Sequence, residues 1–245
     1  MNLYEKFYPE MGISGFSSVD GTVNFYQFVN SLIRSDMTVL DYGAGRGVSH
    51  IDDHCAFRRH LIGFKGRVAK VIGADVDPIV ETNPAIDESV LIAPDGGMAL
   101  PDHSADLIIA DWVFEHLPDP ERAARELERV LKPGGWICAR TPNRNGYVAL
   151  GNRLVPEGLK DRILSRAQPD RKDGDVFPAL YRLNSRSALK TYFPETRFRH
   201  CVYGWNSEPS YVFHNVFVLY AFALLHGLTA RILPLHWHIF IQKRM

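Results

Sequence analysis

The sequence predicts an α/β fold in which a mostly parallel sheet carries helices on both faces. Short runs of apolar and β-branched residues alternate along the chain with stretches in which apolar residues recur at helical spacing. The first apolar run leads into a glycine-rich turn, DYGAGRG, from Asp41 to Gly47. Apolar strands separated by helices are typical of a parallel sheet, whose ligands bind at the carboxyl ends of the strands.

Five strands and two helices are predicted in the first 143 residues. The expected helices cover residues 48–61 and 119–131, and the second has the clearer ends. Asp119 is its expected N-cap, Pro120 occupies the first helical position, and the sequence KPGG after Leu131 ends it. The expected strands cover residues 37–41, 68–75, 89–92, 105–111 and 136–141.

The chain changes character after Pro142. The region from Arg153 to Arg199 holds 11 basic and 6 acidic residues. We expect a solvated surface there, and the alternative is a cationic rim for an anionic substrate. The predicted elements are one or two helices in 145–167, a polar loop over 169–178, a helix over 185–192, and strands over 197–205 and 235–243.

The composition is that of a globular protein with a sizeable core. Of the 245 residues, 46% are hydrophobic and 23% are charged, which excludes disordered, collagenous and small disulfide-stapled chains. Lysine and arginine together number 28, as do aspartate and glutamate, and this zero balance argues against bulk nucleic-acid binding. Cys55, Cys138 and Cys201 are too scattered for a disulfide framework. The opening MNLYEKFYPE lacks the apolar run of a signal peptide, so we expect a cytoplasmic protein.

One long segment, from Pro209 to Ala230, carries no formal charge, and residues 216–225 within it form an unbroken apolar run. A helix that crosses a membrane needs about 20 mostly apolar residues. Asn215 and Gly227 interrupt the longer window. We therefore expect a helix buried in the protein core, and a helix that touches a membrane surface is the alternative.

The glycine-rich turn and the acid after the second strand indicate a nucleoside cofactor. Glycine lets the backbone turn sharply and brings its N–H groups close to a ligand, although such a turn can also be purely structural. The spacing D-x-G-x-G-x-G departs from the G-x-G-x-x-G of dinucleotide sites, because Arg46 and Val48 interrupt that register. Asp75, at the tip of the second strand, can accept both hydroxyls of a ribose. A cofactor without phosphates fits this pattern better than a dinucleotide.

Two further blocks complete the pattern, PDGGMALPDHSADLIIADWVFEHL around the fourth strand and RVLKPGGWICARTPN after the following helix. Together with the glycine turn and VIGADVDP, they resemble the class I S-adenosylmethionine-dependent methyltransferases over residues 36–143. The resemblance implies a Rossmann-like sheet of seven strands, with six parallel and the last antiparallel. It implies S-adenosyl-L-methionine as cofactor and S-adenosyl-L-homocysteine as product. We expect one domain over 1–245, with a helical lid in 1–35, the cofactor-binding core in 36–143 and a substrate-side segment with the C-terminal strands in 144–245.

The resemblance also implies roles for single residues. The acid and the turn after the first strand would hold the amino-acid end of the cofactor, and Asp75 would bind its ribose. Val76 would pack on the adenine, and Asp95 and Gly96 would meet the edge of the adenine ring. Asp111 and Trp112, at the end of the fourth strand, would line the pocket below the sulfonium. The implied cofactor-binding residues are Asp41, Gly43, Ala44, Gly45, Gly47, Asp75, Val76, Asp95, Gly96, Asp111 and Trp112.

The chain is also similar to uncharacterised bacterial methyltransferases of surface-glycan gene clusters, through the phrases FYPEMGISGFS, DWVFEHL, ARTPN, QPDRKDGDVFP and YRLNS. This similarity implies O-methylation of a glycan, a nucleotide sugar or a lipid-linked saccharide. Methylation of a small lipophilic acceptor such as a quinone precursor is the first alternative. A protein that binds the cofactor without catalysis is the second. No nucleic-acid partner is expected, and a peripheral contact with a membrane is possible under the first two hypotheses.

An oxygen acceptor loses a proton, and a general base accelerates that step by about 10²–10⁴-fold. His116, soon after the fourth strand, is the first candidate, unless it caps the following turn or orients Glu115. Asp111 is the second catalytic candidate, with Tyr147 and His214 in reserve. The aromatic residues of the first 30-odd positions are expected to divide between the core and a lid. The expected acceptor-contacting residues are Tyr8, Phe16, Tyr26, Tyr147 and His214.

Two histidine pairs show spacings that can bind metal. His50 and His54 lie four residues apart on an expected helix, but no third strong ligand is implied, so no metal site is predicted. His236 and His238 share one face of the last expected strand, and we interpret them as paired core or surface residues.

Overall fold

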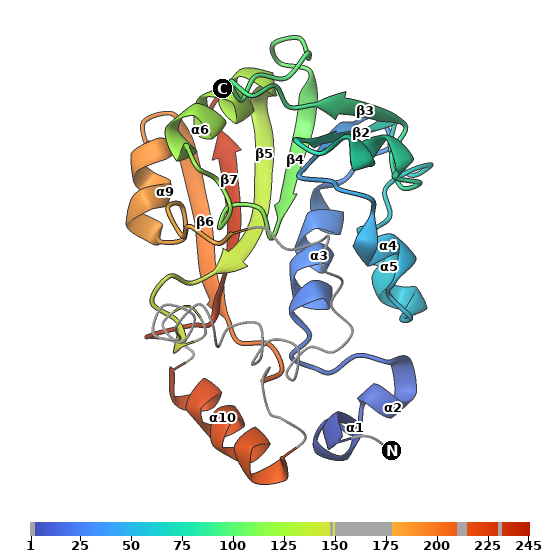
Figure 1. The fold of residues 1–245 in the computed structure, drawn as a ribbon, viewed down its shortest axis with the longest axis vertical. Coiled ribbons are helices and arrows are strands. Elements are labelled where there is room, and N and C mark those ends of the chain that lie inside the picture. Colours follow the sequence, from blue (N-terminus) through green and yellow to red (C-terminus); the bar gives the residue numbers. More distant parts are fainter. Residues whose placement is uncertain (1–2, 148, 150–177, 210–214, 230–231) are drawn as a thin grey trace.

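The computed structural model describes residues 3–147, 149, 178–209, 215–229 and 232–245. Seven strands form one sheet in the order β3-β2-β1-β4-β5-β7-β6 (Figure 1). β7 pairs antiparallel with both β5 and β6, whereas the other pairs are parallel. The predicted topology, with the last strand antiparallel, is therefore confirmed. The strands are β1 (Thr38–Tyr42), β2 (Lys70–Asp75), β3 (Glu88–Leu91), β4 (Ala105–Asp111), β5 (Leu131–Pro142), β6 (Phe198–Trp205) and β7 (His236–Lys243).

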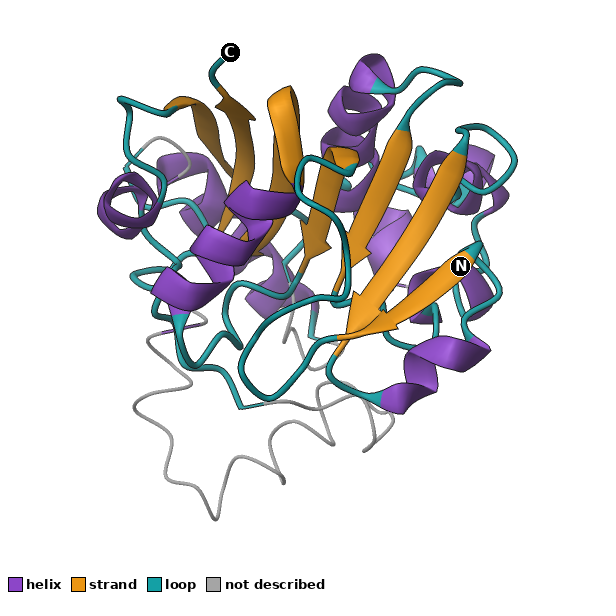
Figure 2. Ribbon diagram, turned by 90° about the horizontal axis from the view of Figure 1, so that it is seen from above, coloured by secondary structure: helices purple, strands orange, loops and turns teal. Residues whose placement is uncertain are grey.

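Helices cover both faces of the sheet (Figure 2). Along β4, the side chain of Ile108 enters one apolar cluster, whereas Leu107 and Ile109 enter the other, because successive residues of a strand point to opposite faces. α6 (Pro120–Val130) and α9 (Arg186–Tyr192) pack in the first cluster. α3 (Gly21–Leu32), α5 (Ala56–Ile62) and the 3₁₀ helix η1 (Pro78–Thr82) pack in the second. The other helices in the described residues are α1 (Leu3–Phe7), α2 (Met11–Ser14), α4 (Val48–Ile51) and α10 (Val216–Thr229).

The predicted ends of α6 are confirmed at its start and refined at its finish. Asp119 caps the helix by accepting the N–H of Arg122 at 3.0 Å, and Pro120 is the first helical residue. β5 begins directly at Leu131, five residues earlier than predicted. Leu131 pairs with Ala105 ahead of an irregularity in the β4–β5 register, and the pairing resumes at Trp136.

The single helix predicted over 48–61 is wrong, because the structure has α4 and α5 with a break between them. Asp53 lies in the break, where its Oδ1 accepts the N–H of Cys55 at 2.7 Å. The same carboxylate pairs with the Arg58 guanidinium. A side chain that bonds the nearby backbone in this way competes with continuous helix.

The prediction of a buried core helix in the uncharged segment is also wrong. α10 lies at the end of the molecule opposite the C-terminus, away from the sheet (Figure 1). Of its side chains, Leu219 and His226 are buried, whereas Phe217 is 81% exposed. No helix within the described ranges is both long and apolar enough to cross a membrane. The predictions for 145–167 and 169–178 fall almost wholly outside the described residues.

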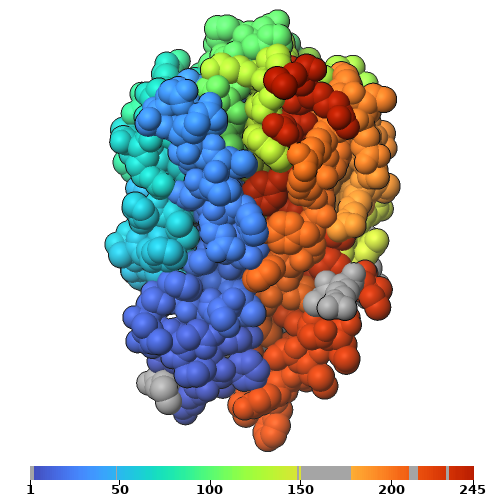
Figure 3. Space-filling model, turned by 180° about the vertical axis from the view of Figure 1, so that it is seen from behind, coloured from blue at the N-terminus to red at the C-terminus, as the bar shows by residue number. Residues whose placement is uncertain are grey.

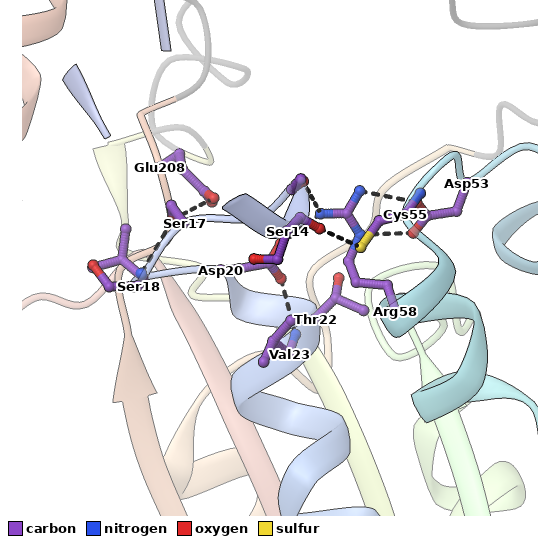
Figure 4. A network of polar contacts seen from close by, with 12 residues as sticks. Ser14, Ser17, Ser18, Asp20, Thr22, Val23, Asp53, Cys55, Arg58 and Glu208 are labelled. Atoms are coloured by element: carbon purple, nitrogen blue, oxygen red, sulfur yellow. Dashed lines mark hydrogen bonds and ion pairs between the residues drawn. The ribbon is translucent and has the colours of Figure 1, made fainter. Parts of the chain in front are cut away.

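The segment before β1 is tied to the rest of the molecule by a polar network (Figure 4). Arg58 on α5 donates to Asp20, the N-cap of α3, at 2.8 Å, and to the carbonyl oxygen of Gly15. Ser17 donates to Glu208 beyond β6 at 2.6 Å. The space-filling view shows this N-terminal segment lying along β6 and α10 (Figure 3). Residues far apart in sequence therefore meet beyond the carboxyl ends of the parallel strands.

Candidate functional site

The glycine-rich turn follows β1 and is fixed from two sides. The N–H groups of Gly43 and Ala44 donate to the carbonyl oxygen of Ala74 on β2. Asn83, after η1, donates its amide to the carbonyl oxygens of Ala44 and Gly45 at 3.0 and 3.2 Å. These contacts hold the turn in a fixed shape without help from a ligand.

Glycine is required in this turn for two different reasons. Gly43, Gly45 and Gly47 all have positive φ, which side-chain-bearing residues rarely adopt. A Cβ on Gly43 would lie 2.4 Å from Val113, and one on Gly47 would lie 2.5 Å from Asn83. A Cβ on Gly45 would meet no atom within 4 Å. Space is therefore open at Gly45, as a cofactor that lies against the backbone requires.

Asp75, the predicted ribose ligand, also organises the turn. Its Oδ2 accepts the N–H of Gly45 at 2.8 Å, and its Oδ1 accepts the N–H of Asp77 at 2.9 Å. Each carboxylate oxygen has a second lone pair, so these bonds leave acceptor capacity for ribose hydroxyls. Val76, the residue expected under the adenine, follows directly and is 63% exposed. The tip of β2 thus presents an acceptor and an open apolar side chain.

Asp41 is the acid of the site that has no cationic partner among the described residues. Burial and the nearby carboxylates of Asp111 and Asp75 raise its pKa from 3.8 to about 7. No donor from the described residues forms a hydrogen bond with its carboxylate. A cation placed here would relieve the repulsion between the three acids. The geometry agrees with the predicted role of Asp41 at the amino-acid end of the cofactor, whose ammonium group is positively charged.

Asp111, at the end of β4, is by contrast fully paired. Arg140 on β5 makes a bidentate ion pair with it at 2.5 and 2.9 Å, and Tyr26 donates its hydroxyl to Oδ2 at 3.0 Å. Burial raises the pKa of Tyr26, and Asp111 raises it further, so the phenol stays protonated as the donor. Arg140 also donates to Thr22 on α3. Both carboxylate oxygens of Asp111 are therefore engaged by protein donors, so its role is to hold Arg140 and Tyr26 in place.

Sequence reasoning missed Arg140, although a signal was present. An arginine in the apolar strand sequence WICART needs a buried partner, and the fourth strand ends in an acid. The buried guanidinium lies 5.1 Å from the centre of the Trp112 ring. Trp112 itself has φ of 59°, an uncommon conformation for a bulky residue, directly after Asp111. The ion pair and this backbone turn together set the position of the indole beside the site.

Asp95 and Gly96, the residues predicted at the adenine edge, lie in the turn that follows β3. Gly96 has positive φ in the turn between β3 and β4. Asp95 accepts the N–H of Gly97 at 3.0 Å and lies 3.5 Å from Arg122. The carboxylate is exposed, so this ion pair is weak and leaves Asp95 accessible to a ligand.

The residues predicted to contact the acceptor divide into two groups. Tyr26 reaches Asp111 and so lies at the site. Tyr147, just beyond β5, bonds His226 of α10 at 2.8 Å. The ring of Phe16 stacks on Phe57 of α5, and Tyr8 packs on Phe7. Within the described part of the chain, both rings pack on other aromatic residues and form no hydrogen bond with the three acids. His214 lies outside the described residues.

Two histidines are placed at the carboxyl edge of the sheet. His116 bonds the carbonyl oxygen of Pro178 through Nδ1 at 3.0 Å. A carbonyl only accepts, so the neutral ring carries its proton on Nδ1 and its lone pair on Nε2. His236, at the start of β7, packs edge-to-face on Trp112 with ring centres 4.8 Å apart. Burial, together with the charge of Arg140, lowers the pKa of His236 from 6.5 to about 3, so its ring is neutral.

Comparison with known proteins identifies the family. A family model described as a methyltransferase domain matches residues 40–139, which run from β1 to β5. These residues are a class I S-adenosylmethionine-dependent methyltransferase domain. S-adenosylmethionine is the cofactor of this domain. The open space at Gly45 fits it, as does the carboxylate of Asp41, which has no hydrogen-bond donor in the described part of the chain.

Curated relatives of this domain include two ubiquinone biosynthesis O-methyltransferases. The one from Thiobacillus denitrificans is 33% identical over 140 residues, 50% of this chain and 55% of that protein. The one from Chromobacterium violaceum is 29% identical over 112 residues, 46% of this chain and 47% of that protein. The chain thus spans about half the length of these relatives.

Solved structures share the fold at low sequence identity. The YcgJ protein of Bacillus subtilis has a TM-score of 0.54 at 18% identity, covering 91% of this chain and 99% of that chain. A SAM-dependent methyltransferase from Aquifex aeolicus has a TM-score of 0.51 at 15% identity, covering 98% of this chain and 96% of that chain. These similarities show that the fold extends over nearly the whole chain.

Gly45→Ala and Gly66→Ala form a matched pair that tests the turn. Both glycines have positive φ with open space around the Cβ position, but Gly66 lies in the loop before β2, at the opposite edge of the sheet. Both variants should lower the free energy of unfolding by roughly 1 kcal/mol, because alanine is strained at positive φ. Only Gly45→Ala should weaken S-adenosylmethionine binding, by at least about tenfold, in calorimetry. Equal affinities for the two variants would contradict a cofactor site at Gly45.

The substitution Asp41→Asn should raise the stability of the protein above neutral pH and weaken its binding of S-adenosylmethionine. A pKa raised from 3.8 to about 7 means that the folded state holds a proton that the unfolded state has lost. The wild-type protein therefore loses stability as pH rises through this window, and the full penalty remains above pH 7. The uncharged variant should unfold at a higher temperature than wild type at pH 8, with a difference that shrinks towards pH 4. Its affinity for S-adenosylmethionine should fall at least tenfold. A variant that unfolds at a lower temperature than wild type and binds S-adenosylmethionine with wild-type affinity would disprove the assignment.

Proposed function

We propose that the protein transfers the methyl group of S-adenosylmethionine to an oxygen atom of its acceptor. The observation that carries the proposal is the cluster of Asp41, Asp75 and Asp111 around the open turn at Gly45. Two of these acids have partners in the protein, and the third has none among the described residues. Such a site is built to hold a ligand that carries positive charge and ribose hydroxyls.

The chain's own residues bind and orient more than they react. When bound, the cofactor supplies a methyl group on a sulfonium sulfur, and the acceptor oxygen forms its bond to that carbon as the carbon–sulfur bond breaks. Asp41 holds the ammonium end, and Asp75 holds the ribose while keeping Gly45 in place. Trp112 and Tyr26 form the apolar wall beside Asp111, which orients the acceptor and excludes water.

The relatives named as O-methyltransferases support an oxygen acceptor. The acceptor classes inferred from sequence remain a hydroxyl of a glycan, a nucleotide sugar or a lipid-linked saccharide. A small lipophilic acceptor such as a quinone precursor is the second candidate, and the names of these two relatives favour it. Lipid-linked saccharides and small lipophilic acceptors share one property. In both, an apolar part of the molecule carries the hydroxyl group that would be methylated at the carboxyl edge of the sheet.

Two histidines divide the handling of the acceptor's proton. His116 is the proposed base, because its hydrogen bond to Pro178 holds an imidazole at the carboxyl edge of the sheet, and histidine is the commonest general base. His236 is too weak a base for that role, since its pKa is about 3. Its neutral ring can still accept a hydrogen bond, and its contact with Trp112 fixes its orientation. We therefore assign His236 to positioning the acceptor hydroxyl.

The direct test follows a labelled methyl group from S-adenosylmethionine. Purified protein is mixed separately with the lipid extract and with the water-soluble saccharide fraction of its source cells, and Asp41→Asn serves as the inactive control. Label should enter one fraction with wild type and neither with the variant. Tight binding of the cofactor without transfer to any fraction would instead support a non-catalytic binding protein.

Steady-state kinetics with the fraction that accepts the labelled methyl group distinguish the roles of the two histidines. His116→Asn should lower kcat by about 10²-fold and leave cofactor affinity unchanged. His236→Asn should raise KM for the acceptor more than it lowers kcat, because it removes an orienting bond and not the base. If both variants keep wild-type kcat and KM, neither histidine handles the acceptor.

A further inference from the structure

The exposed face of α10 is apolar along its whole length. Phe217, Tyr220, Leu224 and Leu228 are spaced by three, four and four residues, so they lie on one face of the helix. Their exposed fractions are 81%, 61%, 66% and 70%. No charged residue occurs between Pro209 and Ala230. A soluble helix usually turns its apolar face inward, whereas this one turns it to solvent.

Other segments add apolar side chains to the same end of the molecule. Ile13 on α2 is 88% exposed, and Ile232, just beyond α10, is 85% exposed. The ring of Phe7 on α1 packs on Tyr220 with centres 4.9 Å apart, which joins the N-terminal helices to α10. Figures 1 and 3 show α1, α2 and α10 together at the end opposite the C-terminus. We call this set of exposed side chains on α2, α10 and residue 232 the apolar end.

The buried side of α10 anchors it close to the methyltransferase site. His226 accepts or donates a bond with Tyr147, which follows β5, and its carbonyl oxygen accepts the Asn206 amide, which follows β6. The ring of Phe222 stacks on Tyr147. The parallel strands point their carboxyl ends towards this end of the molecule (Figure 1). The helix is therefore held beyond the carboxyl ends of the parallel strands, where an acceptor enters.

We propose that the apolar end docks on the surface of a lipid bilayer, from which the site takes a lipid-borne acceptor. A helix of 14 residues is about 21 Å long and cannot span a bilayer, but it can lie in the interface with its apolar face immersed. The choice of acceptor class rests on the proposed methyl transfer, whereas the docking itself does not.

A bilayer fits this surface better than a second copy of the chain. Protein interfaces combine an apolar centre with a polar rim that fixes orientation. The described part of α10 offers no charged side chain for such a rim. Beside the apolar face of α10, Ile13 and Ile232 project from separate segments. Hydrocarbon can surround such projections without a complementary shape, and because the described part of α10 carries no charge, its contact does not depend on anionic lipid.

Vesicle flotation tests the docking without knowledge of the acceptor. Full-length protein is mixed with vesicles of pure phosphatidylcholine, in 0.1 M and in 1 M NaCl. Wild type should float with the vesicles equally at both salt concentrations, because the contact is apolar. Phe217→Glu and Leu224→Glu should each reduce the bound fraction at least tenfold. Met245→Glu is the matched control, since Met245 is a fully exposed apolar residue at the opposite end, and it should float like wild type.

Controls keep the outcomes separate. Each variant is first shown to bind S-adenosylmethionine with wild-type affinity in the absence of lipid, which reports folding and the cofactor site independently of docking. Failure of wild type to float, or its release by 1 M NaCl, would overturn the proposal. A dimer in sedimentation velocity that Phe217→Glu converts to a monomer, without vesicle binding, would also overturn it and assign the apolar end to a second copy.

Discussion

Three carboxylates converge at the carboxyl edge of the sheet, and their mutual repulsion is the constraint on which the site depends. Asp41, Asp75 and Asp111 end three neighbouring strands, so the parallel topology itself brings them together. Protein groups bind two of them by different means. Asp75 receives backbone N–H groups, and Asp111 receives a buried arginine and a phenol. The third remains unneutralised among the described residues, and its raised pKa records the cost.

The surrounding structure can be understood from this arrangement. The glycine turn gains its shape from Asp75 and Asn83, which leaves open space for a ligand above Gly45. α3 packs on the sheet so that Tyr26 and Thr22 complete the partners of the Asp111–Arg140 pair. The N-terminal segment is in turn fixed to α5 through Arg58. The site is therefore organised before the cofactor arrives, which limits the ordering that binding requires.

The sequence allowed the sheet and the cofactor side to be predicted, because both follow from local patterns. Apolar runs, the cap at Asp119 and the glycine spacing each act within a few residues. The break between α4 and α5 depended on a side-chain bond of Asp53, which periodicity does not contain. The pairing of Arg140 with Asp111 and the contact of His236 with Trp112 depend on strands that are distant in sequence and lie side by side in the sheet. The prediction that α10 is buried in the core was wrong, because an apolar sequence does not determine whether protein or another medium covers the helix.

Proton release on cofactor binding tests the central claim most directly. If the buried carboxyl group of Asp41 receives a cation, its pKa must fall on binding, and the proton it holds near neutral pH must leave. Calorimetry of S-adenosylmethionine binding in buffers of different ionisation enthalpy measures the number of protons that are released on binding. We predict a release that approaches roughly one proton at pH 6, declines towards zero at pH 8.5 and disappears in Asp41→Asn. Binding without proton release at pH 6, or release that persists in the variant, would contradict the account.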